Sequence, residues 1–248
     1  MDILQQITDR YNRTARFLPA TLVVLPLFVL AVTAVPVVVT IWTKVAAFAA
    51  FCLPFVASQV VRDRGMQVEP KLFQSWGGRP TENMLRWRST AASAAVARRH
   101  QLVTKYLDIT LPDKVSEAAD PAEADDIYAA ATGALRERTR DKTRFPLVHE
   151  ENISYGFRRN TYACRVPAAV ICLLTAIATI LLARFSLVPL TWQQQAALVG
   201  FDLIAAFGWW RLCTQDAVRR AAEKYASQLF MSLETLGANS GASQSEAP

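Results

Sequence analysis

Two long apolar stretches place the strongest constraint on how this chain can fold. Residues 17–61 contain one charged residue, Lys44, and residues 166–210 contain two, Arg184 and Asp202. Each stretch is about twice the ~20 residues that a helix needs to cross the hydrocarbon core of a bilayer. Each stretch therefore predicts a transmembrane hairpin, and the two hairpins together predict four spans.

The composition agrees with a membrane protein. Of the 248 residues, 52% are hydrophobic and 19% are charged, which is more apolar and less charged than an ordinary soluble domain. Residues 62–164 form a polar block large enough to fold by itself, and its lack of alternating strand character favours helices. We therefore predict an all-α fold. Its expected parts are a cytoplasmic N-terminal segment (1–16), a first transmembrane hairpin (17–61), a cytoplasmic helical domain inserted between spans 2 and 3 (62–164), a second transmembrane hairpin (165–213), a cytoplasmic amphipathic helix (214–236) and a disordered tail (237–248).

The basic residues near the ends of the spans predict the orientation, because cytoplasmic flanks carry an excess of Lys and Arg. Lys44 and Arg184 lie on one side of the predicted spans. The other side has Arg10, Arg13, Arg16, Arg62, Arg64, Arg158, Arg159, Arg165, Arg211, Arg219 and Arg220. Both termini and residues 62–164 are therefore expected in the cytoplasm.

Local signals predict individual helices in the polar block. The motif DPAE is typical of a helix start, with Asp120 as the N-cap and Pro121 in the first turn. A second helix is expected over residues 90–107, and SWGGRPT at 75–81 indicates a turn between helices. The buried face of that second helix is predicted to contain Val96, Val103 and Leu107.

The segment at 214–236 has apolar residues at a spacing that lines one side of a helix. These residues are Val218, Ala222, Tyr225, Leu229 and Leu236. Two interpretations stay open. The helix packs on its own cytoplasmic domain, or it associates with copies of itself below the membrane.

Asp202 is the acidic residue within the predicted spans. It lies about 13 Å along a helix from Arg211, near the midplane, where an isolated charge costs about 2.5 kcal/mol or more. One interpretation is a neutral carboxyl bonded to the hydroxyl of Thr175 or Thr179 on the third span. A second is a carboxylate that faces a water-filled axis in an oligomer and attracts cations. A proton relay is disfavoured, because the spans contain no second acid or histidine.

The sequence offers little for catalysis or metal binding. His100 and His149 lack metal-ligand spacing and are expected at the surface or in an interface, and no GxSxG motif or phosphate loop occurs. The four cysteines lie in or beside the spans without CxxC spacing and are expected to be reduced packing residues. We therefore expect no enzyme activity, no cofactor and no metal.

Clusters of basic residues in the polar block predict a ligand-binding surface. Such a surface can hold phosphate groups, and Trp87 can stack on a base. The predicted residues are Arg86, Trp87, Arg88, Arg98, Arg99, Arg136, Arg140 and Arg144. The alternatives are a solvated helix face, with charges partly cancelled by Glu137 and Asp141, and contact with anionic headgroups.

The motifs VRDRGMQVEPKLFQSWGGRPT and RERTRDKTRFPLVHEENISYGFRRN, with the four-span layout, resemble a family of uncharacterised bacterial inner-membrane proteins. The resemblance covers roughly residues 10–215 and implies a bacterial inner-membrane location. Trp87 and Ser89 stand where that family is expected to have histidine and aspartate. The architecture is also similar to membrane effectors of anti-phage defence, such as the Hailong-type ion channel, in which a nucleotidyltransferase makes a DNA oligomer signal that controls a membrane channel. This similarity implies a nucleotide or oligonucleotide ligand and a partner nucleotidyltransferase.

The leading hypothesis is an oligomeric inner-membrane cation channel that an anionic ligand gates through the basic cytoplasmic domain. Asp202, Thr175 and Thr179 are the predicted pore or selectivity residues. The competing hypothesis is a non-conducting membrane scaffold that recruits a cytoplasmic protein partner, with Asp202 holding helices together. A third is an enzyme that acts on lipid with Glu150 or Glu151.

Overall fold

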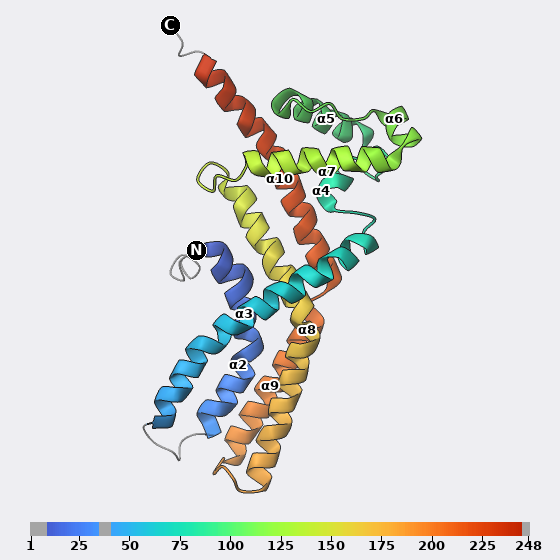
Figure 1. Ribbon diagram of the computed structural model, residues 1–248. Coiled ribbons are helices and arrows are strands. Elements are labelled where there is room, and N and C mark those ends of the chain that lie inside the picture. Colours follow the sequence, from blue (N-terminus) through green and yellow to red (C-terminus); the bar gives the residue numbers. More distant parts are fainter. Residues whose placement is uncertain (1–8, 35–40, 245–248) are drawn as a thin grey trace. The chain divides into compact units, whose positions relative to one another are not determined.

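The computed structural model describes the backbone of residues 9–34 and 41–244 and the side chains of residues 9–33 and 53–236. Its described residues contain helices and no strands, which confirms the all-α prediction (Figure 1). The elements are a π-helical turn η1 (Asn12–Phe17), α2 (Leu18–Ala34), α3 (Ile41–Ser75), α4 (Pro80–Asn83), α5 (Ser93–Leu107), α6 (Lys114–Ala119), α7 (Pro121–Arg138), α8 (Pro146–Arg184), α9 (Trp192–Leu212) and α10 (Gln215–Gln244).

The contacts divide the chain into two compact units. The span unit consists of residues 9–70 and 153–218, and the polar unit consists of residues 71–152 and 219–244. Helices α3, α8 and α10 each have residues in both units, so no helix ends at the predicted domain boundaries 62 and 164. The predicted domain bounds stay a prediction.

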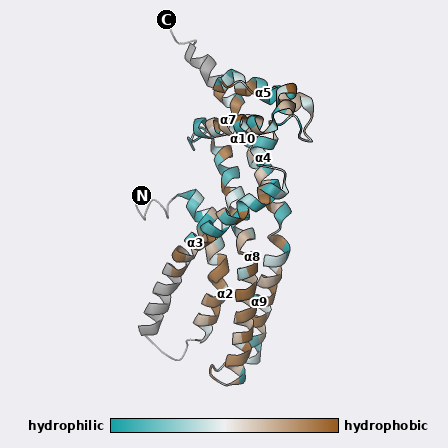
Figure 2. Ribbon diagram, turned by 45° about the vertical axis from the view of Figure 1, so that its right-hand side comes forward, coloured by the Kyte–Doolittle hydropathy of each residue, from teal (hydrophilic) through white to brown (hydrophobic). Residues whose placement is uncertain are grey.

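Two segments are long and apolar enough to cross a membrane, Asn12–Thr33 and Pro146–Arg184. A third candidate combines Trp192–Leu212 with Gln215–Leu236, two helices that bend by 54° at their junction. The described residues thus contain two to three candidate spans. Figure 2 shows α2, the second half of α8 and most of α9 in the colours of hydrophobic residues. The predicted return span of the first hairpin, with Lys44, lies largely outside the described side chains.

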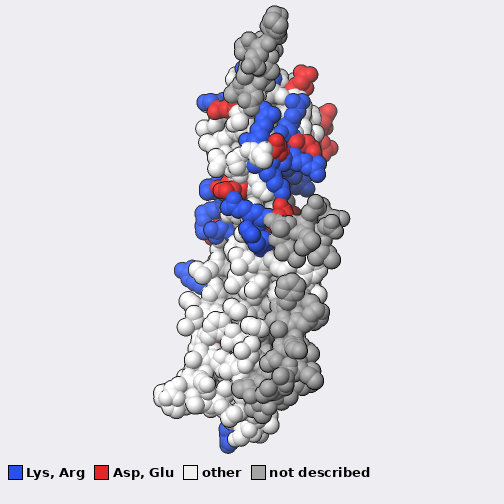
Figure 3. Space-filling view, turned by 90° about the vertical axis from the view of Figure 1, so that its left-hand side faces the viewer, with Lys and Arg blue, Asp and Glu red and all other residues white. Residues whose placement is uncertain are grey.

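Exposed apolar side chains on α8 fit contact with lipid. Seven of them are more than two-fifths exposed, namely Val166, Val170, Leu173, Leu174, Ile177, Ile180 and Leu181. A soluble protein rarely leaves so large a contiguous apolar surface in water. In Figure 3 the described surface of the spans is largely white, which means that few charged residues lie on it, and most charged residues lie elsewhere. The chain is therefore a membrane protein with transmembrane helices.

The predicted second hairpin has a defined turn. Helix α8 ends at Arg184 and α9 begins at Trp192 with a capping box. The Thr191 amide donates to the Gln194 side chain at 2.9 Å, and the Gln194 amide donates to the Thr191 hydroxyl at 3.3 Å. This reciprocal pair satisfies backbone donors that the first turn of a helix leaves unpaired.

Close helix contacts hold the span unit together where η1, α3 and α8 meet. The Asn160 side chain of α8 is buried and donates to the Ala15 carbonyl of η1 at 2.6 Å. Gly65 of α3 lies against Asn160, and a Cβ there would overlap the Asn160 carbonyl oxygen. Gly156 of α8 leaves room for Tyr11, whose hydroxyl lies 3.0 Å from the position of an added Cβ. Small residues at such crossings let backbones approach and let an amide bond across the helices.

The polar unit has its own hydrophobic core. Leu85, Val103, Tyr128, Leu135 and Leu229 are among its fully buried members, and they come from the loop after α4, α5, α7 and α10. The amphipathic helix α10 thus packs its apolar side on this unit, which supports the first of the two interpretations of that helix.

The predicted start of α7 and the predicted buried face of α5 are confirmed. The Asp120 carboxylate accepts from the amides of Ala122 at 3.1 Å and Glu123 at 3.0 Å, as expected for an N-cap. Helix α5 begins at Ser93, three residues later than expected. Its buried residues are Val96, His100, Val103 and Leu107.

Candidate functional site

The polar unit contains a cavity of about 560 Å³ with an unusual number of arginines. We name it the arginine cavity. Its walls come from the turn after α3, from α4, from the loop between α4 and α5, from α5, and from the first turns of α10. The lining residues are Trp76, Gly77, Pro80, Asn83, Met84, Arg86, Arg88, Ser89, Thr90, Ala91, Arg99, Arg219 and Glu223.

One wall is a glycine turn that follows α3. Gly77 and Gly78 have φ angles of +74° and +130°, which L side chains rarely adopt. The turn presents the Gly77 carbonyl to the Arg86 guanidinium, which donates to it at 2.6 Å. A Cβ on Gly78 would overlap that guanidinium and lie 2.7 Å from the Asn83 side-chain oxygen. The SWGG motif therefore positions Arg86.

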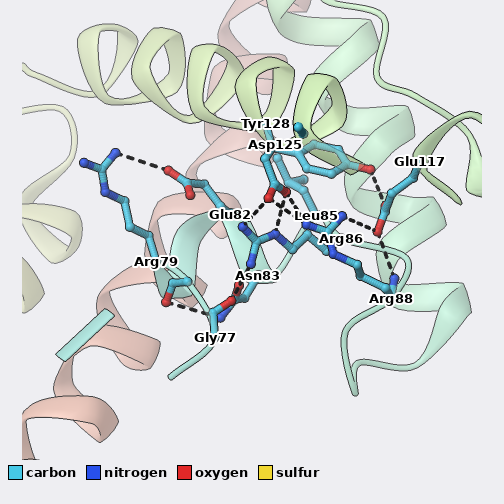
Figure 4. A network of polar contacts seen from close by, with 12 residues as sticks. Gly77, Arg79, Glu82, Asn83, Leu85, Arg86, Arg88, Glu117, Asp125 and Tyr128 are labelled. Carbon is cyan, nitrogen blue, oxygen red and sulfur yellow. Dashed lines mark hydrogen bonds and ion pairs between the residues drawn. The ribbon is translucent and has the colours of Figure 1, made fainter. Parts of the chain in front are cut away.

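Arg86 and Arg88 are both held by the same carboxylate of α7 (Figure 4). The Asp125 carboxylate accepts from Arg86 Nε at 2.8 Å and from Arg86 Nη2 at 2.9 Å. Arg88 Nη2 donates to the two Asp125 oxygens at 2.6 and 2.7 Å. The bidentate Arg86 contact fixes the plane of that guanidinium as well as its position. Much of the positive charge of this pair is therefore matched inside the protein.

A buried carboxylate fixes the loop that contains Arg88. The Glu117 side chain is 2% exposed and accepts from the Trp87 amide at 2.7 Å, the Arg88 amide at 3.1 Å and the Tyr128 hydroxyl at 2.6 Å. Burial alone would raise the pKa of Glu117, but these hydrogen bonds outweigh burial and hold the pKa below its usual value. Burial and the adjacent carboxylate raise the pKa of Tyr128. Glu117 is therefore a charged structural anchor.

Arg99 is the arginine of the cavity whose charge is not matched. Its Nη1 donates to the Met84 carbonyl at 3.0 Å, and within the described residues it forms no ion pair with an acidic side chain. Burial lowers the pKa of Arg99, which reflects a cation without a compensating anion. Arg219 differs, because it pairs with Glu223 at 2.8 Å.

Trp76 contributes a second unmatched donor. Its side chain is 9% exposed, and its indole Nε1 has no hydrogen-bond partner among the described residues. Buried polar groups in native proteins are almost always paired, so this indole is an exception among the residues that line the cavity. The unmatched charge of Arg99 makes the cavity suited to an anionic group.

The structure brings only part of the predicted ligand-binding surface to this cavity. Arg86, Arg88 and Arg99 line it, whereas Trp87, Arg98, Arg136, Arg140 and Arg144 do not. The Trp87 indole donates to the Pro112 carbonyl at 3.1 Å, and its ring meets the His100 ring edge-on at 4.8 Å between centroids.

The remaining predicted arginines have local partners. Arg98 pairs with Glu234 at 2.5 Å, and Arg140 pairs with Glu137 at 3.5 Å. Arg136 donates to the carbonyl of Thr132 at 3.3 Å. The Arg144 guanidinium lies 5.3 Å from the centre of the Phe145 ring. The predicted site as a whole stays a prediction, and the cavity supports three of its members.

The predicted pore residues lie inside the span unit. Asp202 is 4% exposed, and its side chain lies beside Thr175 of α8. Thr175 and Thr179 are both buried, and the Thr179 hydroxyl donates to the Thr175 carbonyl at 2.9 Å. Within one chain, Asp202 therefore faces α8, as expected for the hydrogen-bonded alternative.

His100, which was expected at the surface or in an interface, is buried within the polar unit. Its Nε2 lies 2.7 Å from the Leu85 carbonyl, a bond that lets α5 bury the ring. His149 is half-buried. Cys164, Cys172 and Cys213 carry free thiols. The described residues contain no group of three or more His, Cys, Asp or Glu side chains placed to hold a metal ion.

Sequence reasoning missed three important lining residues, Trp76, Asn83 and Arg219. The SWGG motif was interpreted only as a turn, although its tryptophan supplies the unmatched donor. Arg219 is distant in sequence from the others, and only the packing of α10 on the polar unit brings it to the cavity. Comparison of the chain with protein families, curated proteins and solved structures finds no match. The family resemblance suggested by the motifs therefore stays a prediction.

Proposed function

We propose that this chain is a membrane receptor whose polar unit binds an anionic ligand, of the nucleotide or oligonucleotide class, in the arginine cavity. The observation that carries this proposal is the Arg99 guanidinium, which lines the cavity and has no acidic partner among the described residues. Guanidinium groups match phosphate geometry and donate to phosphate oxygens.

The volume of the cavity and its charge suit part of such a ligand. About 560 Å³ is within the range of small-molecule sites. Asp125 and Glu117 match the charges of Arg86 and Arg88, so these two arginines act mainly as preoriented donors. Preorganised donors lose less entropy when a ligand binds. This charge distribution best fits a ligand that has one phosphate group at Arg99 and its polar remainder toward Arg219.

The finer membrane architecture belongs to the same proposal. We infer four spans in a bacterial inner membrane, with both termini and residues 62–164 in the cytoplasm, from the excess of arginine at one side of the spans. This orientation would expose the arginine cavity to cytoplasmic nucleotides. A nucleotidyltransferase that makes the ligand is the partner expected from the resemblance to defence effectors.

An oligomeric cation channel is the proposed output of ligand binding. A ligand can open such an assembly only if it binds one state better than the other. The position of Asp202 beside Thr175 favours the competing scaffold hypothesis for this carboxylate, because the acid is buried within its own chain. A selectivity role for Asp202 therefore requires α9 to turn this side chain away from α8 in the open state.

Ligand-dependent stability of the full-length protein in detergent tests the receptor proposal. ATP and a short DNA oligonucleotide are the probes, and inorganic phosphate is the comparison. A bound ligand stabilises the folded state in proportion to its occupancy. We expect one nucleotide probe to raise Tm in the wild type and in Arg98→Gln but not in Arg99→Gln. Equal shifts in both variants would place the ligand outside the arginine cavity.

A further inference from the structure

The span unit contains a second cavity, of about 380 Å³, with apolar walls. Leu22, Leu25 and Pro26 of α2 form one wall, and Phe201, Ala205 and Gly208 of α9 form the opposite wall. Arg158 and Thr161 of α8 lie at its polar end, together with Thr214. We name it the span cavity. It is independent of the arginine cavity and of the proposed function.

Aromatic contacts place the polar end of the span cavity at the level of the membrane interface. The Arg165 guanidinium lies 4.4 Å from the centre of the Tyr162 ring and 5.9 Å from the centre of the Trp210 ring. Tyr, Trp and Arg gather where the hydrocarbon core meets the headgroups. Phe201 lies about 15 Å along α9 from Arg211, so the cavity runs from the headgroup level toward the middle of the bilayer.

Charge at the mouth of the cavity selects the headgroup. The Arg158 side chain is exposed and lines the cavity. In the part of the chain that the structure describes, no acidic side chain pairs with Arg158. The span cavity has apolar walls and an unmatched cation at the headgroup level, so it complements a molecule with a hydrocarbon tail and a negatively charged headgroup.

We propose that the span cavity binds an anionic phospholipid, with one acyl chain between α2 and α9 and the phosphate group on Arg158. The surrounding bilayer supplies this ligand at high local concentration. Hydrocarbon in the cavity restores the dispersion contacts that its lining atoms otherwise lack. The cation then favours phosphatidylglycerol over a zwitterionic lipid.

Two glycines of α9 offer a matched pair of variants. A Cβ added to Gly208 or to Gly200 meets no atom within 4 Å, so neither position resists a larger side chain. Gly208 lines the span cavity, whereas Gly200 does not. Gly208→Leu therefore fills the space for the acyl chain, and Gly200→Leu adds the same apolar side chain elsewhere on α9. Ala205→Leu fills the same cavity from a second position.

Native mass spectrometry of the delipidated full-length protein, titrated with phosphatidylglycerol or phosphatidylcholine, tests the proposal. The wild type and Gly200→Leu are expected to bind one phosphatidylglycerol about five-fold more tightly than phosphatidylcholine, as one interfacial cation would give. Arg158→Gln should lose this preference and keep binding, and Gly208→Leu should lose specific binding of both lipids.

Two results would overturn the proposal. Lipid binding by Gly208→Leu at the level of Gly200→Leu would show that the acyl chain lies elsewhere. An undiminished preference for phosphatidylglycerol in Arg158→Gln would show that another group selects the headgroup. Circular dichroism checks that each variant is folded, and Ala205→Leu takes the place of Gly208→Leu if the latter does not fold.

Discussion

The Asp202 side chain of α9 is buried beside the Thr175 side chain of α8. The Thr175 hydroxyl is also within hydrogen-bond distance of two carbonyls of its own helix, Ile171 at 3.0 Å and Cys172 at 2.9 Å. A hydroxyl has one proton to donate, so it serves either the carboxylate or a carbonyl. Protonation of Asp202 would resolve this conflict, because its O–H could then donate to Thr175 while Thr175 donates to the backbone. In that state the pair would join α8 and α9 without a buried charge.

This pair predicts a measurable contribution to helix packing. Thr175→Val keeps the shape of the side chain but removes the partner of Asp202, and we expect it to lower the free energy of unfolding by about 1 kcal/mol. Thr21→Val is the matched control, because the Thr21 hydroxyl bonds only to the Phe17 carbonyl and is exposed on α2. Unfolding in mixed micelles checks both variants. Equal stability of the two variants would contradict an interhelical role for Thr175.

Cation flux into liposomes tests the proposed channel. If Asp202 sets cation preference in an open oligomer, Asp202→Asn keeps the size of the side chain but removes the charge. We expect ligand-dependent cation flux in the wild type and reduced cation-over-anion selectivity in the variant. Absence of flux in the wild type at saturating ligand, or unchanged selectivity in Asp202→Asn, would favour the scaffold hypothesis instead.

The buried Glu117 carboxylate should make part of the free energy of unfolding depend on pH. Glu117→Gln introduces N–H donors where several donors already converge, which should cost about 2 kcal/mol at pH 7. The pKa of Glu117 is lowered in the folded protein, so its stabilisation is complete above the unfolded pKa of about 4.3 and disappears as the pH falls through the folded value. The difference in the free energy of unfolding between the wild type and Glu117→Gln, measured from pH 7 to pH 3, should become smaller below about pH 4. Glu137→Gln, at an exposed position, should have the same free energy of unfolding as the wild type at every pH. A difference between wild type and Glu117→Gln that stays constant in acid would contradict the role of Glu117 as a charged anchor.

Alanine substitutions at the two glycines of the turn are predicted to differ in their effect on stability. Gly77→Ala meets only backbone strain, of about 1 kcal/mol, because a Cβ at that position contacts no atom within 4 Å. Gly78→Ala adds an overlap with Arg86, so we expect a larger loss of stability and a weaker affinity for the ligand of the arginine cavity. Thermal unfolding and ligand titration of both variants check the order. A Gly77→Ala variant as damaging as Gly78→Ala would mean that strain alone governs this turn.

Local signals in the sequence were enough to predict several elements. Asp120 caps α7 because a cap depends on a few neighbouring residues. The apolar stretches predicted membrane helices because hydrophobic length is itself a local property. Positions that depend on distant partners were not predictable in this way. His100 is buried because its Nε2 donates to the Leu85 carbonyl, which lies on a different element, and no periodicity encodes that contact.

The arginine cavity shows the same limit for the candidate site. Charge clustering identified Arg86, Arg88 and Arg99 but gave equal weight to Arg98, which pairs with Glu234 and lies outside the cavity lining. Adjacent positions on a helix point about 100° apart, so Arg98 and Arg99 meet different surroundings. Only the packing of α5 decides which of the two meets the cavity.

The affinity of the full-length protein for a nucleotide probe, compared between Arg99→Gln and Arg98→Gln, tests the central claim most directly. Isothermal titration in detergent at constant salt should give a Kd about ten-fold higher for Arg99→Gln, as expected when one charge-assisted hydrogen bond is lost. Arg98→Gln should bind as the wild type does. Equal affinities of Arg99→Gln and Arg98→Gln for every probe that the wild type binds would contradict the account.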